Sequence, residues 1–215
     1  MSNENINRFN KVASKWDENP QRLKMAKNIV ERMAQETSFD TSASVLDYGC
    51  GTGLVSLELA KLVGHITGVD ASAGMLDIMN QKIAEAHIPN INTVECEYSD
   101  SVFAKLGPFD IAVSSMVMHH IDNPDQFVSA LYNVVSPSGH VLIADLDEED
   151  GSFHEDMTGV HHKGFSRDRF IETLTVAGFT GIRVTEAHTM TRETPSGPKD
   201  YTILLAIGTK GKIND

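Results

Sequence analysis

The stretch Val45-Leu46-Asp47-Tyr48-Gly49-Cys50-Gly51-Thr52-Gly53 decides how the rest of the chain is organised. It predicts a short strand that breaks into a glycine-rich turn, and the turn opens a helix at Leu54. Glycines at alternate positions permit the positive-φ bends that such a turn needs, and they remove side chains that would keep a ligand off the backbone. In open α/β sheets, a strand–turn–helix unit of this kind binds nucleotide-like ligands at the carboxyl ends of the strands. The stretch therefore predicts a site for an adenosine-containing cofactor.

The composition fits one soluble globular domain. The chain has 215 residues, 40% hydrophobic and 22% charged, and no Pro/Gly/Ser-rich linker or internal repeat divides it. Cys50 and Cys96 are too few for a disulfide framework or a cysteine-rich metal site. Strand-sized apolar runs and the polar start Ser2-Asn3-Glu4-Asn5 predict a cytoplasmic protein with no membrane segment. A net charge of −12 disfavours nucleic acid as a partner, because binding a phosphate backbone needs clustered Lys and Arg.

Two helices are predicted ahead of the glycine turn. Ile6, Phe9, Ala13 and Trp16 share one face of the first, and Asn19-Pro20 separates it from the second. Aromatic side chains at helical spacing usually belong to a core, so we expect the first helix to pack on the sheet. The alternative is a lid, with Phe9 or Trp16 closing over a ligand.

Beyond residue 40, strands and helices alternate. The expected strands are Ser44–Tyr48, His65–Asp70, Ile91–Glu95, Phe109–Ser114, His140–Asp145, Ile182–Glu186 and Thr202–Gly208. The expected helices are Thr52–Val63, Ser72–Ala86 with Ser72 as its N-cap, Pro124–Val135, and Ser166–Ala177 ending at Gly178. Alternation at this spacing indicates parallel pairing with right-handed crossovers, and the short connection Ala187–Tyr201 suggests an antiparallel pair at one edge. The sequence thus predicts an α/β fold: a Rossmann-like three-layer αβα sandwich with a mostly parallel seven-stranded sheet and an antiparallel edge strand near the C-terminus.

Two adenosine cofactors compete for this architecture. Dinucleotides favour a third glycine three positions after Gly51, where this chain has Leu54. The carboxylate of Asp47, just inside the strand, would repel a pyrophosphate but suits a ligand with an ammonium group, such as S-adenosylmethionine. Asp70, about twenty residues beyond the turn, can accept both hydroxyls of a ribose and fits either cofactor; its alternative role as a helix cap is already filled by Ser72. Electrostatics therefore favour S-adenosylmethionine, with an NAD-dependent oxidoreductase as the less favoured alternative.

At this point the residues resemble a known family, the class I S-adenosylmethionine-dependent methyltransferases, and within it the small-molecule group that includes quinone-biosynthesis enzymes. The resemblance covers roughly residues 40–185. It rests on four motifs in chain order, which are Val45–Gly53, Gly68-Val69-Asp70-Ala71-Ser72 followed by Met75, Phe109-Asp110 leading to His119-His120, and Val135-Ser136-Pro137-Ser138-Gly139-His140-Val141.

The resemblance implies roles for individual residues. Gly49 and Gly51, with Asp47 behind them, would cradle the methionine part of the cofactor, and Ser115 would lie beside it. Asp70 would bind the ribose hydroxyls. The adenine side would be formed by Ala71, Met75, Glu97 and the backbone N–H of Tyr98. The family more often has Gly-Asp where this chain has Glu95-Cys96-Glu97, so Glu95 and Asp100 stay open as alternatives to Glu97.

The family architecture also implies a division of residues 1–215, which we expect to form a single methyltransferase domain. Residues 1–40 would be an N-terminal helical lid or layer, and residues 41–146 the cofactor-binding core. Residues 147–215 would supply an acceptor-side loop, a helix and the last two strands. Oligomeric state is not predicted.

Methyl transfer from a sulfonium is an in-line displacement, which leaves S-adenosylhomocysteine as the product and needs a base only if the acceptor loses a proton. His119 and His120, just beyond the fourth strand, are the candidate catalytic pair, with a purely structural role as the alternative. A second polar cluster follows the fifth strand and comprises Asp145, Asp147, Glu148, Glu149, Asp150, His154, Glu155, Asp156, His161 and His162. We interpret it first as a solvated acidic loop. It could instead be an acceptor site with His161 or His162 as base, or a divalent-metal site of Asp145, His154 and the histidine pair; the spacing matches no fixed metal signature, so no metal is expected.

Absent motifs narrow the acceptor. Enzymes that methylate amino groups of nucleic-acid bases carry an Asn/Asp-Pro-Pro-aromatic stretch after the fourth strand, where this chain has Ser114-Ser115-Met116-Val117. Arsenic methyltransferases rely on several cysteines, and two are too few. Both absences favour a small-molecule acceptor. The alternative from another class is a cofactor-binding protein without turnover.

Overall fold

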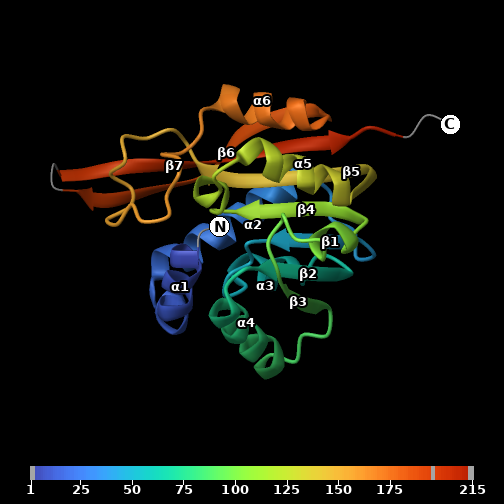
Figure 1. Cartoon of the computed structure of the whole chain (residues 1–215), viewed down its shortest axis with the longest axis horizontal. Coiled ribbons are helices and arrows are strands. Elements are labelled where there is room, and N and C mark those ends of the chain that lie inside the picture. The colour runs from blue at the N-terminus through green and yellow to red at the C-terminus, as the bar shows by residue number, and fades with distance from the viewer. Residues whose placement is uncertain (1–2, 195–196, 213–215) are drawn as a thin grey trace.

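The computed structural model describes residues 3–194 and 197–212 of the chain, and over these residues seven strands form one sheet in the order β3-β2-β1-β4-β5-β7-β6 (Figure 1). The strands are β1 (Ser44–Tyr48), β2 (His65–Asp70), β3 (Ile91–Glu95), β4 (Phe109–Ser115), β5 (Val135–Leu146), β6 (Phe179–Thr194) and β7 (Gly197–Lys210). The α-helices are α1 (Asn3–Val12), α2 (Pro20–Glu36), α3 (Leu54–Leu59), α4 (Ala73–Glu85), α5 (Pro124–Val134) and α6 (Arg167–Ala177). Short 3₁₀ turns are η1 (Ala13–Glu18), η2 (Phe103–Lys105) and η3 (Met118–His120).

The direction of the strands confirms the predicted fold class. β1 pairs in parallel with β2 on one side and β4 on the other, and β3 and β5 extend the parallel sheet outward. β7 runs antiparallel between β5 and β6. The chain order reverses between β1 and β4, and ligands of open α/β sheets bind at the carboxyl ends of the strands beside such a reversal. The glycine turn after β1 lies at this point.

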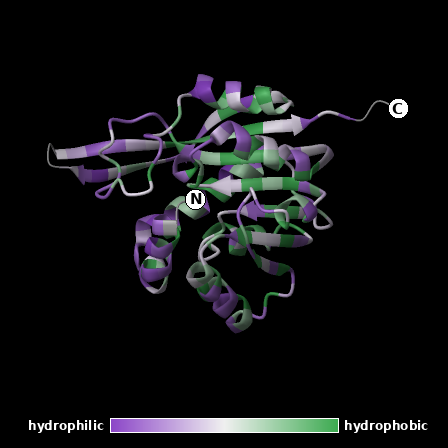
Figure 2. Cartoon of the chain, in the orientation of Figure 1, coloured by the Kyte–Doolittle hydropathy of each residue, from purple (hydrophilic) through white to green (hydrophobic). Residues whose placement is uncertain are grey.

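Helices cover both faces of the sheet and make three layers. Val45 and Ile66 point to a core shared with α2, α3 and α4, whereas Leu46 and Val69 point to one shared with α5 and α6. Neighbouring side chains on a strand point to opposite faces, so a strand buried on both sides is apolar throughout, and Val141–Ala144 are all fully buried. Figure 2 shows the resulting hydrophobic centre, with hydrophilic residues gathered on the outer helices.

Several predicted helix ends are confirmed. The Ser72 side chain accepts a hydrogen bond from the Met75 backbone N–H and caps α4, and Ser166 caps α6 in the same way. Gly178 ends α6 in the left-handed conformation, at φ +103°. By contrast, the helix predicted over Thr52–Val63 is only the six residues of α3 (Leu54–Leu59): Gly53 at φ +84° delays its start, and the helix ends four residues earlier than predicted.

The last two strands are much longer than predicted. β6 and β7 continue past the sheet as a two-stranded arm, so the connection expected over Ala187–Tyr201 is largely paired, as in Thr189↔Thr202 and Glu193↔Pro198 (Figure 1). Threonine is a good strand former, but Met190 and Tyr201 are the only described residues of this arm that pack in the core, too few to give an apolar alternation. Pro195 and Ser196, which were part of the predicted connection, lie outside the described residues. β5 is also longer than expected, with Ser138 at φ +66° inside it and a register shift at its start.

The two N-terminal helices pack in different places. α2 packs on the sheet through Ile29, Val30 and Met33, all buried. α1 does not form a layer on the sheet; it contacts α4 and η1 (Figure 1). The expectation that the first helix packs on the sheet is therefore wrong, because Phe9 turns its ring toward a cavity instead. Across the described residues, no helix combines the length and apolar character needed to cross a membrane.

Candidate active site

The glycine turn is held open by its own backbone. Gly49, Gly51 and Gly53 all have positive φ, at +72°, +53° and +84°. The N–H of Gly49 donates to the Val69 carbonyl at 2.7 Å, which ties the turn to the end of β2. A Cβ placed on Gly51 would meet no atom within 4 Å, and Gly51 lines the cavity. The turn therefore presents bare backbone to whatever occupies that cavity.

Asp47 lies behind this turn at the end of β1. Its side chain is buried, and Ser56 Oγ donates to its Oδ2 at 2.5 Å. Burial raises the pKa of Asp47 to about 7, and the nearby Asp70 adds to the rise, against the Ser56 hydrogen bond. A cation arriving at this end of the cavity would favour the ionised carboxylate. The site is thus built to gain from a positively charged ligand group.

This geometry predicts a proton released on cofactor binding. The pKa of Asp47 in the folded protein is about 7 against an ordinary value of 3.8, so the free protein holds a proton there below pH 7. Folded stability contributed by this proton is present at low pH and is lost as pH rises toward 7. A bound ammonium or sulfonium lowers the pKa, so affinity for S-adenosylmethionine should rise by up to about tenfold per pH unit toward pH 7 and then level off.

Titration calorimetry at pH 6 in two buffers of different ionisation enthalpy measures this proton directly. Release of up to one proton per cofactor is expected from the wild type and none from Asp47→Asn. Proton uptake by the wild type, or equal release by both proteins, would contradict the prediction.

Asp70 brackets the turn from the end of β2. Its Oδ2 accepts the Gly51 N–H and its Oδ1 accepts the Ser72 N–H, each at 2.8 Å. Ser72 itself caps α4, so Asp70 is not the cap. Its carboxylate instead links the glycine turn to the start of the helix through these two hydrogen bonds. Burial raises its pKa, against hydrogen bonds from Ser72 and Gly51. Each carboxylate oxygen has a second lone pair, and Asp70 lines the cavity, so it can also accept from a ligand hydroxyl.

Asp70→Ala is expected to weaken binding of S-adenosylhomocysteine by about 1–3 kcal/mol, because ligand hydroxyls lose a charged acceptor. Titration calorimetry gives the affinity, and thermal unfolding reports separately on the lost ties to Gly51 and Ser72. Asp77→Ala is the matched control, since Asp77 is an exposed carboxylate on α4 and is not among the residues that line the cavity. Equal affinities for Asp70→Ala and wild type would limit Asp70 to a structural tie.

The remaining predicted cofactor residues fall in two places. Met75 and Ser115 line the cavity, whereas Ala71, Glu97 and Tyr98 are not among its lining residues. The backbone N–H of Tyr98 donates to Tyr48 Oη at 3.2 Å, so it already has a partner. The roles of Ala71, Glu97 and Tyr98 stay predictions.

Three histidines gather where the acceptor was expected. His119 and His120 form η3 after β4, and His154 comes from the loop after β5. Their ring centroids lie 4.1–5.8 Å apart. His119 Nδ1 lies 2.6 Å from the buried Oδ1 of Asp145, and His120 Nδ1 lies 2.7 Å from the Gly159 carbonyl. Since both partners are acceptors, each Nδ1 carries the hydrogen, and each Nε2 keeps its lone pair.

Two of the three histidines, His120 and His154, are kept neutral by their surroundings. Burial lowers the pKa of His120 to about 3, with His119 adding to the fall, and the same two causes lower the pKa of His154 to about 4. Burial works to raise the pKa of Asp145, but His119 beside it and hydrogen bonds from His119 and Leu146 hold it below its ordinary value. The arrangement places an ionised carboxylate beside His119, with neutral imidazoles at His120 and His154 next to it.

The polar segment after β5 is divided by the fold. Asp145 and His154 join the cluster, and Glu155 and Asp156 line the cavity. His161 and His162 lie outside the lining; their backbone N–H groups donate to the His119 carbonyl and hold η3 in place. The His161 side chain is 3.5 Å from Asp122. The segment is therefore neither wholly a solvated loop nor a site centred on His161 or His162.

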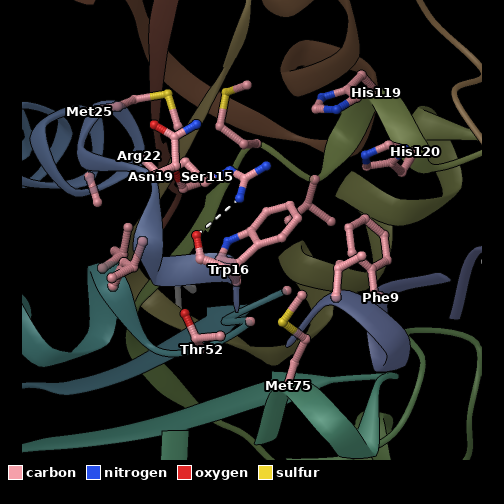
Figure 3. A pocket seen from close by; sticks show the side chains of 18 of the residues that line it. Phe9, Trp16, Asn19, Arg22, Met25, Thr52, Met75, Ser115, His119 and His120 are labelled. Carbon is pink, nitrogen blue, oxygen red and sulfur yellow. Dashed lines mark hydrogen bonds between the residues drawn. The ribbon is translucent and has the colours of Figure 1, made fainter. Parts of the chain in front are cut away.

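A single cavity of about 680 Å³ joins the glycine turn to the histidine cluster, and Figure 3 views it from close by. Phe9, Trp16, Asn19 and Arg22 reach it from the N-terminal segment. Arg22 stacks on the Trp16 ring at 3.7 Å and donates to the Trp16 carbonyl. Burial lowers the pKa of Arg22, and the nearby Arg192 adds to the fall. Sequence reasoning missed Arg22 and Arg192 as site residues, because no spacing links them to the glycine turn.

The cavity is large enough for a cofactor-sized ligand, since small-molecule sites span about 300–1,000 Å³. The chain matches other proteins over the same regions. Residues 45–139, which carry the turn and the histidine pair, match the family described as methyltransferase domain. An uncharacterized methyltransferase of Schizosaccharomyces pombe is 28% identical over 84% of this chain and 80% of its own length. A ubiquinone biosynthesis O-methyltransferase of Maricaulis maris is 28% identical over 70% of this chain and 64% of its own.

Among solved structures, the fold resembles phosphoethanolamine N-methyltransferase 2 of Haemonchus contortus in complex with S-adenosyl-L-methionine. That likeness has a TM-score of 0.67 at 16% identity and covers 95% of this chain and 60% of the other. It concerns the fold, and the sequence matches concern the family. By its motifs, its sheet order and its relatives, the chain belongs to the class I S-adenosylmethionine-dependent methyltransferases.

Proposed function

We propose that this enzyme transfers the methyl group of S-adenosylmethionine to a small-molecule acceptor by in-line displacement, with the acceptor held at the histidine cluster. The observation that carries the proposal is the single cavity that joins the glycine turn to His119, His120 and His154. A displacement needs donor and acceptor in one enclosed space and in line. A cavity with a cofactor-type turn at one part and unpaired imidazole nitrogens at another meets that need.

The donor end has groups of both signs, which fits a methionine moiety. Asp47 is buried and gains from an ammonium, while Arg22 reaches the same cavity and can bind a carboxylate. Bare backbone at Gly49 and Gly51 leaves room beside them, and Asp70 offers its carboxylate to ribose hydroxyls. When bound, the cofactor supplies a methyl group on a positively charged sulfur. This chain's residues bind and orient it, and Phe9 and Trp16 cover the cavity from the N-terminal segment.

The acceptor end offers lone pairs rather than positive charge. The Nε2 atoms of His119 and His120 can accept the hydrogen of an acceptor O–H, N–H or S–H group, and Asp145 fixes the orientation of His119. As the acceptor heteroatom attacks the methyl carbon, the carbon–sulfur bond breaks and the acceptor's proton passes to an imidazole. The histidine cluster thereby orients the acceptor and removes its proton.

A small acceptor is supported by charge and by the relatives. A net charge of −12 opposes a nucleic-acid substrate. Two of the proteins compared above carry the name of a small molecule, ubiquinone in one and phosphoethanolamine in the other. The alternative of a cofactor-binding protein without turnover draws no support from a cavity that continues past the donor end.

The test has two stages. Titration calorimetry should detect S-adenosylhomocysteine but not NADH; the reverse would overturn the proposal. Protein with methyl-labelled S-adenosylmethionine is then offered a panel of catechols, amines and thiols, and label transfer is followed by mass spectrometry. Transfer to a panel member supports the proposal, and transfer only to nucleic acid or protein would exclude a small acceptor.

A further inference from the structure

The histidine cluster has a second property that proton acceptance does not need. Its three residues each offer a ring nitrogen, and these nitrogens all lie within 4.8 Å of one another. Two of the residues are buried and one is half-buried. Figure 3 shows His119 and His120 side by side, well away from Thr52 and Met75 at the donor side of the cavity. One nitrogen from each of the three imidazoles therefore lies in the same small volume.

We propose that His119, His120 and His154 bind one divalent transition-metal ion of the zinc class through the nitrogens that face the cavity. Zinc–imidazole bonds of about 2.0–2.1 Å place two ligand nitrogens on a tetrahedral ion roughly 3.4 Å apart. The rings therefore need to approach by little more than about 1 Å, which small side-chain rotations supply. Three histidines with the fourth position open form the usual ligand set of a catalytic zinc site.

Hydrogen bonds on the far side of the rings fit a metal site. Asp145 accepts from His119 Nδ1 at 2.6 Å, and the Gly159 carbonyl accepts from His120 Nδ1 at 2.7 Å. Both bonds select the tautomer whose Nε2 lone pair is free to bind an ion. At metal sites, the ring N–H of a metal-bound histidine commonly donates to a carboxylate or carbonyl, which fixes the orientation of the ring. Asp145 is thus a positioning residue, itself fully buried and tied to the backbone N–H groups of His119 and Leu146.

The charges around the cluster are compatible with a cation. The positive groups nearby are Arg8 and Arg192, and each donates to a backbone carbonyl, that of Thr158 and that of Phe153 respectively. Asp145 supplies negative charge behind His119. We expect the ion to bind more weakly than at a structural site with four protein ligands. Its binding should still depend on all three of His119, His120 and His154.

A bound ion would occupy the Nε2 lone pairs and would itself activate the acceptor in place of the imidazoles; this step alone rests on the proposed function. The open fourth position faces the cavity, where an acceptor oxygen or sulfur could bind the ion. A bound hydroxyl or thiol loses its proton more readily, and that proton passes to solvent. The resulting anion attacks the methyl carbon as the carbon–sulfur bond breaks. Hydroxyl and thiol acceptors would therefore be favoured over amines.

The test uses full-length, tag-free protein treated with a chelator and then dialysed. Co²⁺ is titrated while visible absorption is followed, and Zn²⁺ is used to displace it. One ion per chain with intense tetrahedral-type bands is expected. His154→Ala should weaken binding by at least about 100-fold, beyond the 10–100-fold expected for Asp145→Asn. His161→Ala is the matched control, because His161 is close in sequence but outside the cavity lining, and it should bind Co²⁺ as the wild type does.

Binding of S-adenosylhomocysteine is measured on the same samples, so that folding and donor binding are read separately. His154→Gln is tested alongside His154→Ala, and the comparison uses the variant that keeps wild-type affinity for S-adenosylhomocysteine. Equal Co²⁺ affinity for that variant and wild type, or no ion bound by the wild type, would overturn the metal site. Methyl transfer at full rate by chelator-treated protein would remove its chemical role and leave the proposed function intact. Failure to bind S-adenosylhomocysteine with a normal metal site would sink the proposed function alone.

Discussion

Gly49→Ala should lower the free energy of unfolding by about 2–5 kcal/mol, whereas Gly51→Ala should lower it by only about 1 kcal/mol. Both glycines have positive φ, which costs any residue with a Cβ. Only Gly49 is also crowded, since its Cβ would lie 2.2 Å from Val117 Cγ2. Val117 is buried and β-branched, so it has no free rotamer to turn into. Denaturant unfolding followed by circular dichroism measures both variants.

A second substitution, at Val117, separates the cost of the positive φ at Gly49 from the cost of steric crowding. Val117→Ala removes the crowding methyls, so Gly49→Ala combined with Val117→Ala should lose less stability than the sum of the two single changes. Gly51→Ala has the opposite signature: its Cβ enters the cavity, so it should fold well and lose affinity for S-adenosylhomocysteine by tenfold or more, on the order of 1–2 kcal/mol. Equal destabilisation by the two alanines would show that φ alone governs the turn.

The glycine turn belongs to the part of the structure that the sequence could predict. Local chemistry decided the turn, the Ser72 cap and the Gly178 helix end, because each depends on a residue type acting on its own backbone neighbours. The parallel sheet followed from the alternation of apolar strands with helices. Where a polar segment forms strands, as in the arm of β6 and β7, the apolar signal is absent and the pairing was missed.

The acceptor end shows the limit more clearly. Asp145, His119 and His154 meet because β4 and β5 are neighbours in the sheet and their following loops fold over the same edge. The sequence offered all three residues, but it gave no reason to choose His154 over His161 or His162. Arg22 and Trp16 reach the cavity from more than twenty residues ahead of the turn. Such contacts are set by tertiary packing, which spacing along one chain does not encode.

Asp145→Asn should reduce turnover by about 100-fold to 10,000-fold with a much smaller effect on cofactor affinity. Asp145 Oδ1 accepts from both His119 Nδ1 and the Leu146 N–H, and Oδ2 accepts from the His119 N–H. An amide has only one oxygen, so its NH₂ group must face one of these donors. If it faces His119 Nδ1, the ring takes the opposite tautomer and its Nε2 carries a hydrogen. Unfolding measurements should show a loss of about 1–3 kcal/mol for the donor left without an acceptor.

Steady-state kinetics with the acceptor found in the panel above, together with calorimetry for S-adenosylhomocysteine, check this expectation. If Asp145→Asn changes only the tautomer of His119, kcat should fall while cofactor affinity stays nearly unchanged. If the substitution disrupts the whole site, both kcat and cofactor affinity should fall. His161→Ala is the control, because His161 contacts exposed Asp122 and not the cavity, and it should keep its turnover. If His161→Ala instead lost activity and Asp145→Asn kept it, the base would belong to the loop after β5. The hydrogen bond between Asp145 and His119 would then serve only to hold η3 in place.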